Sequence, residues 1–353
     1  MHGVIIGVDV GATTISAGLI TPHGEVLTAV QVPTRSTPRA DAVQTLFALV
    51  RDLAAEGRQR RLDLHAIGIG LPGLVDVERG MMVDGFNLVS EFAHVPLAER
   101  LEAAAGLPAF VDNDANALAL GEWMYGSARG ASSFALLAVG TGVGGGMVLD
   151  GRLIRGEQGL AGEWGHVSCD PRGPACVCGA RGCLNTYAGG QALAEAARRE
   201  ARRGRGGRLA ALAGHPEAIT AEVVFQAAAL GDSAAAEIVE RACRALGATV
   251  GMIVNSLNPA LVLVTGGVAG SLAPLRERIF AHAARCALAP ALAAARLIIS
   301  PTDKSRTVVG GAALAVYELE RRAARGPADR QTAAAEAAGT RARHVRRASD
   351  PEP

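Results

Sequence analysis

One pattern occurs twice in this chain: an apolar run, a glycine turn, a second apolar run and a hairpin turn. The first copy covers Val4–Val8, Asp9 to Gly11, Ile15–Ile20 and Pro22-His23-Gly24, with a further run from Val26. The second covers Phe134–Val139, Gly140-Thr141-Gly142, Gly146–Leu149 and Asp150-Gly151. Short β-branched runs joined by such turns are typical of antiparallel strands. The repetition predicts an internal duplication, in which each copy starts one domain and a cleft lies between the two.

The rest of the chain alternates helices and strands, as an α/β protein does. We expect helices near 39–56, 96–105, 116–125, 232–257 and 308–319, and strands near 66–71, 109–111 and 261–264. A length of 353 residues also favours two domains. The segment 202–207 reads as a flexible loop. From about Arg325 the sequence has no periodic apolar face, so we expect a disordered tail over 325–353.

Composition excludes several classes of function. A net charge of +1 gives no general attraction to nucleic acid or anionic lipid. No apolar run reaches membrane-spanning length without glycine or charge, and the start MHGVIIGVDVGATT lacks the charged region of a signal peptide. We therefore expect a cytoplasmic protein with no membrane partner. The basic tail is expected to be solvated.

The first glycine turn combines Asp9 and Gly11 with Thr13 and Thr14. Glycine allows a phosphate to approach backbone N–H groups closely, and threonine hydroxyls donate to phosphate oxygens. A carboxylate at this place is suited to holding Mg²⁺. The alternative is an ordinary hairpin with polar turn residues.

The second glycine turn, Gly140 to Gly146, matches the spacing of a dinucleotide-binding loop. That motif requires a helix after the glycines, whereas Met147-Val148-Leu149 and an Asp-Gly hairpin follow here. A phosphate loop between two strands is the remaining interpretation. Two such loops at matched places favour binding of a nucleotide triphosphate from both sides.

Two further clusters carry chemistry. Asp112, Asn113 and Asp114 follow a strand and open a helix, where capping explains one of them and a general base is the second interpretation. His166, Cys176, Cys178 and Cys183 supply one nitrogen and three sulfurs, the ligands of a closed structural zinc site. Cys169 is a rival fourth ligand.

Six motifs together resemble the ROK family of sugar kinases and sugar-responsive repressors. They are Asp9-Val10-Gly11-Ala12-Thr13, Gly70-Leu71-Pro72-Gly73, Asn113-Asp114-Ala115-Asn116, Gly140 to Gly146, Gly162-Glu163-Trp164-Gly165-His166, and Cys176-Val177-Cys178-Gly179 with Gly182-Cys183-Leu184. The resemblance runs from about Gly3 to Glu318. It implies the two-domain α/β fold of actin and hexokinases (ribonuclease H-like), with ATP and sugar in the interdomain cleft. We place the first domain at 1–117 plus 306–324 and the second at 118–305, with the zinc loop at 166–183.

The resemblance also implies roles for individual residues. Asp114 corresponds to the catalytic base, and Gly73, Asn113, Glu163 and His166 correspond to the sugar site. His166 is then both a sugar ligand and a zinc ligand. Asp9, Gly11 and Thr13 correspond to the first phosphate loop, Thr141 and Gly142 to the second, and Gly266 and Gly267 to the adenosine motif. A homodimer is expected from the family alone.

One position departs from the family pattern: Asn185 stands where the kinases usually have a glutamate that binds a sugar hydroxyl. We expect Asn185 to bind the substrate at this place, and because an amide donates as well as accepts, it leaves the preferred sugar open. We expect a glucokinase that phosphorylates the 6-hydroxyl, with an N-acetylmannosamine or other N-acetylhexosamine kinase as one alternative. A non-catalytic sugar sensor is the other. Repressors of the family carry a helix-turn-helix before the first strand, which here begins by Val4, so no nucleic-acid partner is expected.

Overall fold

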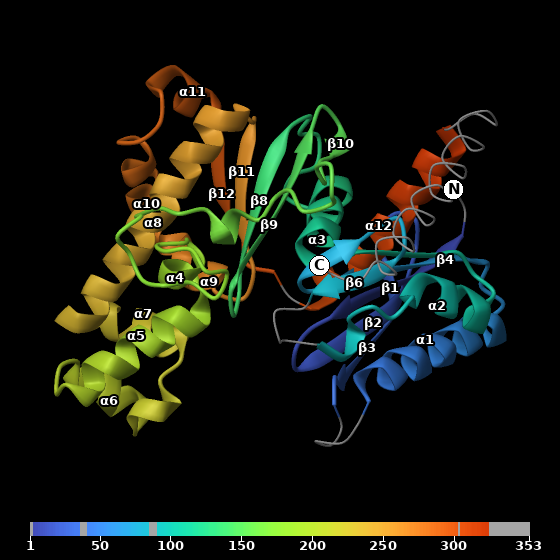
Figure 1. Cartoon of the computed structure of the whole chain (residues 1–353), viewed down its shortest axis with the longest axis horizontal. Coiled ribbons are helices and arrows are strands. Elements are labelled where there is room, and N and C mark those ends of the chain that lie inside the picture. The colour runs from blue at the N-terminus through green and yellow to red at the C-terminus, as the bar shows by residue number, and fades with distance from the viewer. Residues whose placement is uncertain (1–2, 36–40, 85–89, 303, 325–353) are drawn as a thin grey trace, which may run out of the picture.

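The computed structural model describes residues 3–35, 41–84, 90–302 and 304–324, and it contains two five-stranded sheets with the same topology (Figure 1). The first has the order β3-β2-β1-β4-β7 and the second β10-β9-β8-β11-β12. In each sheet three antiparallel strands are followed by two that run parallel to the first of them. The predicted duplication and two-domain α/β fold are thereby confirmed.

The strands of the first sheet are β1 (Val4–Val10), β2 (Thr14–Ile20), β3 (Val26–Pro33), β4 (Leu64–Leu71) and β7 (Ala109–Asn113). Those of the second are β8 (Phe134–Val139), β9 (Val143–Leu149), β10 (Arg152–Leu153), β11 (Leu261–Thr265) and β12 (Arg296–Ile299). A small hairpin pairs β5 (Leu74–Asp76) with β6 (Met81–Asp84).

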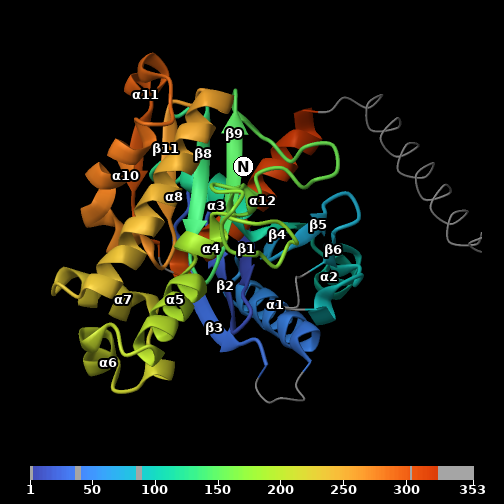
Figure 2. The ribbon, with the colours of Figure 1, turned by 60° about the vertical axis from the view of Figure 1, so that its left-hand side comes forward.

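Helices cover both outer faces of the sheets and fill the space between them. The outer face of the first sheet packs on α1 (Ala42–Gln59) and α2 (Leu97–Ala105). That of the second packs mainly on α5 (Gly190–Arg202), α7 (Ala221–Ala229), α8 (Ser233–Leu257) and α10 (Arg276–Ala283). Between the sheets lie α3 (Asp114–Met124) and α12 (Lys304–Ala324), which share one core with both (Figures 1 and 2). Shorter helices are α4 (Asn185–Ala188), α6 (Gly207–Ala213), α9 (Ala269–Leu272) and α11 (Ala289–Ala294).

The sequence of β1 is an almost continuous apolar run because both faces of this strand are buried. Ile6 and Val8 face the core under α1, whereas Ile5 faces the core that contains α12. A strand covered on both faces has no polar side. Gly7 is required on the α12 face, because a Cβ there would lie 2.2 Å from the carbonyl oxygen of Val308. The chain therefore returns to the first domain through its last described helix.

The predicted elements are confirmed with shifted boundaries. The helix expected near residue 39 begins at Ala42, because Asp41 Oδ1 accepts from Val43 N–H at 2.9 Å and caps it. The strand expected from Gly146 begins at Val143, so the second glycine turn is shorter than predicted. The segment 202–207 joins α5 to α6. The tail at 325–353 lies outside the described residues.

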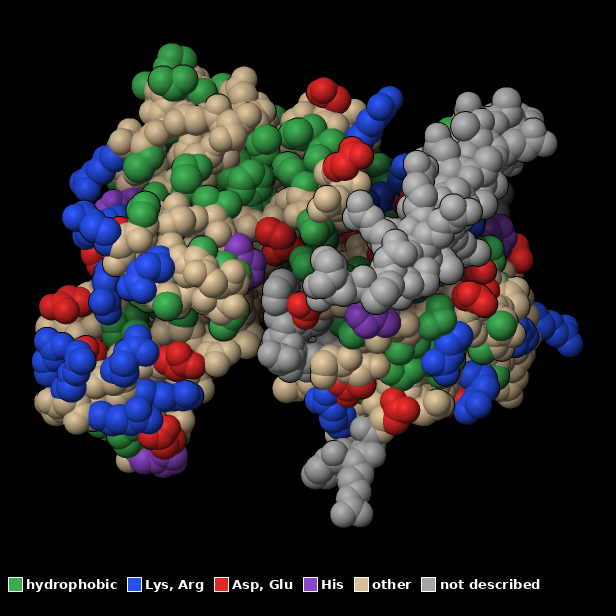
Figure 3. Space-filling view, viewed as in Figure 1, with side chains coloured by type: hydrophobic (Ala, Val, Ile, Leu, Met, Phe, Trp, Pro, Cys, Tyr) green, Lys and Arg blue, Asp and Glu red, His purple; other side chains and the backbone are tan. Residues whose placement is uncertain are grey.

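The boundary between the domains stays a prediction. The limit proposed at 117/118 falls within α3, which packs on both sheets. On the face shown in Figure 3 the molecular outline is notched between the two domains, as an interdomain cleft requires.

Across the described ranges, no helix is both long enough and apolar enough to pass through a bilayer.

Candidate active site

The first glycine turn joins β1 to β2, and hydrogen bonds from the buried residue Thr34 hold it in place. Gly11 N–H donates to the Thr14 carbonyl at 2.9 Å, which closes the turn. Thr34, fully buried after β3, donates its hydroxyl to the Gly11 carbonyl at 2.7 Å and its N–H to the Thr13 carbonyl at 2.9 Å. The backbone of the loop is thus preformed. Thr34 was not predicted from the sequence, since a single threonine after a strand carries no signal.

The same edge of the first sheet carries the acidic cluster. Asp9 is opposite Gly70 in the ladder between β1 and β4, and Gly70 is opposite Asp112 in the ladder between β4 and β7. The carboxyl ends of these parallel strands therefore meet at one edge. Such an edge is where α/β sheets bind ligands.

Asn113 and Asp114 form the start of α3. Asn113 Oδ1 caps the helix by accepting from Ala115 N–H at 2.9 Å and Asn116 N–H at 3.2 Å. Its Nδ2 donates to the Gly73 carbonyl at 3.0 Å, which ties the β4–β5 loop to the helix start. The structure therefore brings together Gly73, Asn113 and Asp114, as predicted. The capping interpretation is confirmed for Asn113, and the general base stays a prediction for Asp114.

Asp112 belongs to a buried ion cluster. Its carboxylate accepts from Arg155 Nε at 2.7 Å and from Asn116 Nδ2 at 3.0 Å, and Arg155 Nη2 also lies 2.7 Å from Glu318. Burial alone would lower the pKa of Arg155, but the carboxylates of Asp112 and Glu318 outweigh it and raise that pKa. Asp112 is thus engaged within the protein, whereas Asp114 is partly exposed on the first turn of α3. Of the two carboxylates, that of Asp114 is the more exposed, and it accepts from Ala115 N–H at 2.8 Å.

The second glycine turn lies at the corresponding edge of the second sheet. Gly140 N–H donates to the Gly142 carbonyl at 2.8 Å, and the first residues of α5 hold the loop from outside. There Gly190 N–H donates to the Gly140 carbonyl at 2.8 Å and Gln191 N–H to the Thr141 carbonyl at 3.0 Å. The turn at Gly266 is adjacent, since a Cβ at Gly266 would lie 2.5 Å from the Val139 carbonyl. Thr141, Gly142 and Gly266 are therefore neighbours, as the predicted nucleotide site requires.

The remaining glycines of this run lie in β9 and serve close packing. A Cβ at Gly146 would lie 3.0 Å from the Ala115 carbonyl in α3, and a Cβ at Gly145 would lie 2.4 Å from the carbonyl of Gly162. The strand thus begins before the predicted Gly146, and Gly144 and Gly145 lie in β9, not in the glycine turn. Through these contacts β9 is packed between the start of α3 and the segment that contains Glu163.

Glu163 and His166 lie in that segment, at the short 3₁₀ helix Trp164–His166. Burial raises the pKa of Glu163, and no side chain or backbone N–H of the described residues donates to its carboxylate. Burial also lowers the pKa of His166, which favours the neutral imidazole. A half-buried carboxylate without a protein partner is suited to accepting hydrogen bonds from a ligand.

The four predicted metal ligands form one cluster, with ligand atoms within 4.8 Å of one another. Cys178 Sγ lies 3.7 Å from Cys183 Sγ, and His166 Nδ1 lies 3.5 Å from Cys176 Sγ. Two sulfurs on one tetrahedral zinc, each about 2.3 Å from the ion, are about 3.8 Å apart. The donor set and its spacing therefore fit zinc.

Cys169 is not part of this cluster. Its Sγ lies 3.2 Å from Thr249 Oγ1 on α8, and burial raises the pKa of its thiol. The rival four-sulfur site is therefore not the arrangement found.

Asn185, the first residue of α4, is oriented toward the second glycine turn. Its Oδ1 accepts from Val143 N–H at 3.0 Å. A Cβ at Gly142 would lie 2.9 Å from the same oxygen. Asn185 is thus packed directly on the loop.

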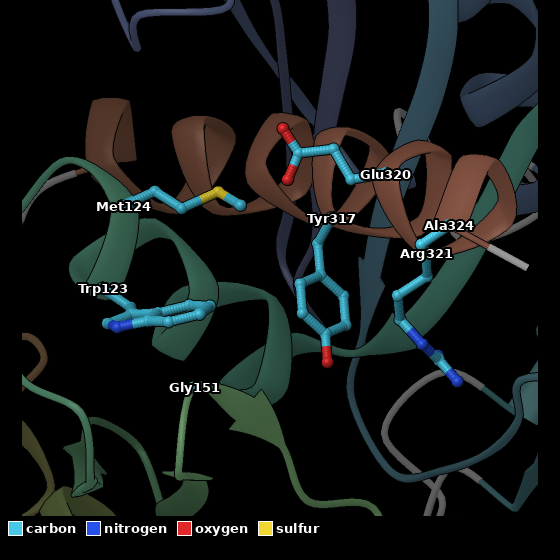
Figure 4. Close-up of a pocket in the computed structure, with 7 residues that line it drawn as sticks. All are labelled: Trp123, Met124, Gly151, Tyr317, Glu320, Arg321 and Ala324. Atoms are coloured by element: carbon cyan, nitrogen blue, oxygen red, sulfur yellow. The ribbon is translucent and has the colours of Figure 1, made fainter.

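A cavity of about 450 Å³ lies elsewhere, between the end of α3, the end of α12 and the turn after β9 (Figure 4). Its lining consists of Trp123, Met124, Gly151, Tyr317, Glu320, Arg321 and Ala324. It contains none of the predicted site residues.

Comparison with known proteins agrees with this geometry. The family model "ROK family" matches residues 5–318. A glucokinase from Halalkalibacterium halodurans is 34% identical over 308 residues, which cover 87% of this chain and 93% of that protein. An N-acetylmannosamine kinase from Salmonella typhimurium is 37% identical over 194 residues, covering 55% of this chain and 64% of that one.

Among solved structures, a ROK family glucokinase from Streptomyces griseus in complex with glucose and AMPPNP superimposes with a TM-score of 0.74 at 31% identity. The match covers 88% of this chain and 99% of that chain. A family model that spans most of the sequence, relatives above 30% identity and a shared two-domain fold agree with one another. The chain belongs to the ROK family.

Proposed function

We propose that this protein is an ATP-dependent hexose kinase that transfers the γ-phosphoryl group to the 6-hydroxyl of glucose. The packing of β9 carries the proposal. On one side β9 contacts the first turn of α3, which holds Asp114, and on the other it contacts the segment that holds Glu163. The strand β9 begins at Val143, directly after the second phosphate loop. Candidate base, sugar ligand and phosphate loop are therefore linked through a single strand.

In this proposal Asp114 is the general base. The oxygen of the sugar 6-hydroxyl attacks the γ-phosphorus, its proton passes to the Asp114 carboxylate, and ADP leaves with the electron pair of the broken bond. Most of the rate enhancement in such reactions comes from positioning and from stabilising charge. General-base assistance contributes about 10²–10⁴-fold.

The two glycine turns bind the triphosphate. Asp9, Gly11, Thr13 and Thr14 form one side, Thr141 and Gly142 form the other, and Gly266 and Gly267 contact the adenosine. Asp9 would hold Mg²⁺, which neutralises phosphate charge when bound. Closure of the domains would exclude water and limit ATP hydrolysis.

The sugar contacts Gly73, Asn113, Glu163 and His166. The unpartnered carboxylate of Glu163 supports this assignment. His166 Nδ1 lies 3.5 Å from Cys176 Sγ, and in this proposal its Nε2 contacts a sugar hydroxyl. His166, Cys176, Cys178 and Cys183 would hold zinc, which in a closed four-ligand site orders the loop and does no chemistry. A cytoplasmic location is part of the proposal, since thiolates stay reduced there.

A second candidate function is phosphorylation of N-acetylmannosamine. The observation that favours it is the 37% identity to the Salmonella typhimurium kinase over 194 residues. A sugar sensor without catalysis is the third candidate, and it is motivated only by Asn185. A homodimer stays a prediction.

The test is ADP release from the purified, zinc-replete protein with Mg-ATP and a panel of hexoses and N-acetylhexosamines. ADP release that depends on glucose is the expected result. ADP release with an N-acetylhexosamine alone would identify that sugar, and not glucose, as the substrate. Sugar binding without any sugar-dependent ADP release would contradict the kinase proposal and favour the sensor.

A further inference from the structure

Asn185 stands between two parts of the candidate site. It follows two residues after Cys183, one of the four clustered metal ligands, and it opens α4. Its side chain reaches the other way, to the loop that joins β8 and β9. The residue therefore connects the cysteine loop to the second phosphate loop.

The hydrogen bond to Val143 fixes the orientation of the amide. A backbone N–H can only donate, so the atom that faces Val143 N at 3.0 Å is the acceptor Oδ1. The amide nitrogen Nδ2 is then on the opposite side of the group. Within the described ranges no residue accepts a hydrogen bond from this nitrogen.

The amide oxygen of Asn185 packs closely against two glycines. A Cβ at Gly142 and a Cβ at Gly189 would each lie 2.9 Å from Asn185 Oδ1. The two glycines thus let Asn185 approach the backbone of the phosphate loop on one side and of the residue before α5 on the other. The oxygen is thus engaged by the backbone of the loop, and Nδ2 is the polar atom of this side chain that has no acceptor among the described residues.

The surroundings of this donor favour an anion. The N-terminus of α5 begins at Gly190, and its first turn contains no acidic residue. Helix N-termini carry a partial positive charge that stabilises phosphate. A carboxylate at position 185 would place a negative charge against Gly142, whereas the amide adds a neutral N–H donor.

We propose that Asn185 is a positioning residue of the second phosphate loop, and that its Nδ2 donates to the phosphoryl groups of the nucleotide. On this proposal it is not a ligand of the sugar. The inference rests on the proposed function, because it takes the Gly140–Gly142 turn as a phosphate loop. It places Asn185 on the nucleotide side of the site, whereas the family pattern predicts the sugar side.

The test measures binding without turnover, by calorimetry of a non-hydrolysable ATP analogue with Mg²⁺ and, separately, of glucose. Asn185→Asp keeps the size of the side chain and an acceptor for Val143, but replaces the donor with a negative charge. It should weaken the nucleotide roughly tenfold or more, the order expected for a like charge near a partly screened phosphate. Asn185→Ala should weaken the nucleotide less, because it adds no charge. Glucose affinity should stay within about twofold of the wild type in both variants.

Loss of glucose affinity with unchanged nucleotide affinity would overturn the proposal and make Asn185 a sugar ligand. Equal loss of both affinities in both variants would also overturn it. Wild-type protein that binds neither molecule would contradict the proposed function itself, so the two failures are distinguishable. Zinc content and thermal unfolding of each variant establish that the loop is intact.

Discussion

Arg155 Nε donates to Asp112 Oδ2 at 2.7 Å, and this bond fastens the segment leading to Glu163 onto the strand that ends beside Asp114. The side chain of Asp112 is 1% exposed and that of Arg155 is 12% exposed. Glu318 on α12 completes the cluster at 2.7 Å from the same guanidinium. The three residues come from β7, from the loop after β10 and from α12, so the pair joins three parts of the chain around the candidate base.

Arg155→Met should destabilise the protein by about 3–5 kcal/mol, because it leaves two carboxylates without their cation in a buried place. The measurement is equilibrium unfolding in urea. Arg60→Met is the matched control, since Arg60 pairs with Glu56 at 2.9 Å but is 41% exposed. That exposed pair should contribute less than about 1 kcal/mol. Similar losses in the two variants would contradict the assignment of a buried cluster.

Asp114→Asn should lower kcat by about 10²–10⁴-fold, because the amide cannot accept the hydroxyl proton. Glucose affinity and the melting temperature should stay near the wild-type values. Asp112→Asn is the control within the same motif. The Asp112 variant should have a lower melting temperature, because the substitution disrupts the bond to Arg155. Near-normal turnover by the Asp114 variant would rule out Asp114 as the base.

Local signals account for what the sequence predicted. The turns at Gly11 and Gly142, the helix start at Asn113 and the cysteine spacing all depend on residues within a few positions of one another. The duplication of the fold followed from the repeated pattern of strands and glycine turns. Such features are set by backbone geometry and side-chain chemistry that a short window contains.

Tertiary contacts account for what the sequence did not predict. Arg155 is 43 residues from Asp112 and 163 from Glu318, so no window could have joined them. Gly144 and Gly145 appeared to be part of a turn because of their composition alone. They lie in a strand because α3 and the Gly162 segment approach its backbone from both sides. The orientation of Asn185 likewise depends on Val143, which is 42 residues away.

Glu163→Gln should raise the melting temperature near pH 7 and leave it unchanged near pH 4. In the unfolded chain Glu163 ionises near 4.5, and burial raises its pKa in the folded protein. Between those two values the folded state keeps the proton more often, so the free energy of unfolding falls as pH rises through this window. At pH values above the folded-state pKa, the buried charge of Glu163 still lowers the free energy of unfolding. Glutamine carries no charge and removes this cost. The measurement is thermal unfolding of the zinc-replete protein across pH.

The same substitution should weaken glucose binding, with a cost of about 1.5–3 kcal/mol for a lost charged acceptor. Glu122→Gln is the matched control for stability. Glu122 is also buried, but it accepts from Arg306 at 2.8 Å and from Ser127 N–H at 2.7 Å. Its neutral variant should therefore be less stable at pH 7. A Glu163 variant that is destabilised in the same way would show that Glu163 has a cationic partner.

Cys176→Ser should abolish binding of one equivalent of zinc per chain, whereas Cys169→Ser should retain it. Cys176 Sγ lies 3.5 Å from His166 Nδ1 within the cluster, while Cys169 Sγ contacts Thr249 on α8. Elemental analysis of the purified variants checks the metal content. Because Cys183 precedes Asn185 by two positions, removal of zinc from the wild type by a chelator should weaken both glucose and nucleotide binding. Zinc loss in the Cys169 variant as well as in the Cys176 variant would restore the four-sulfur alternative.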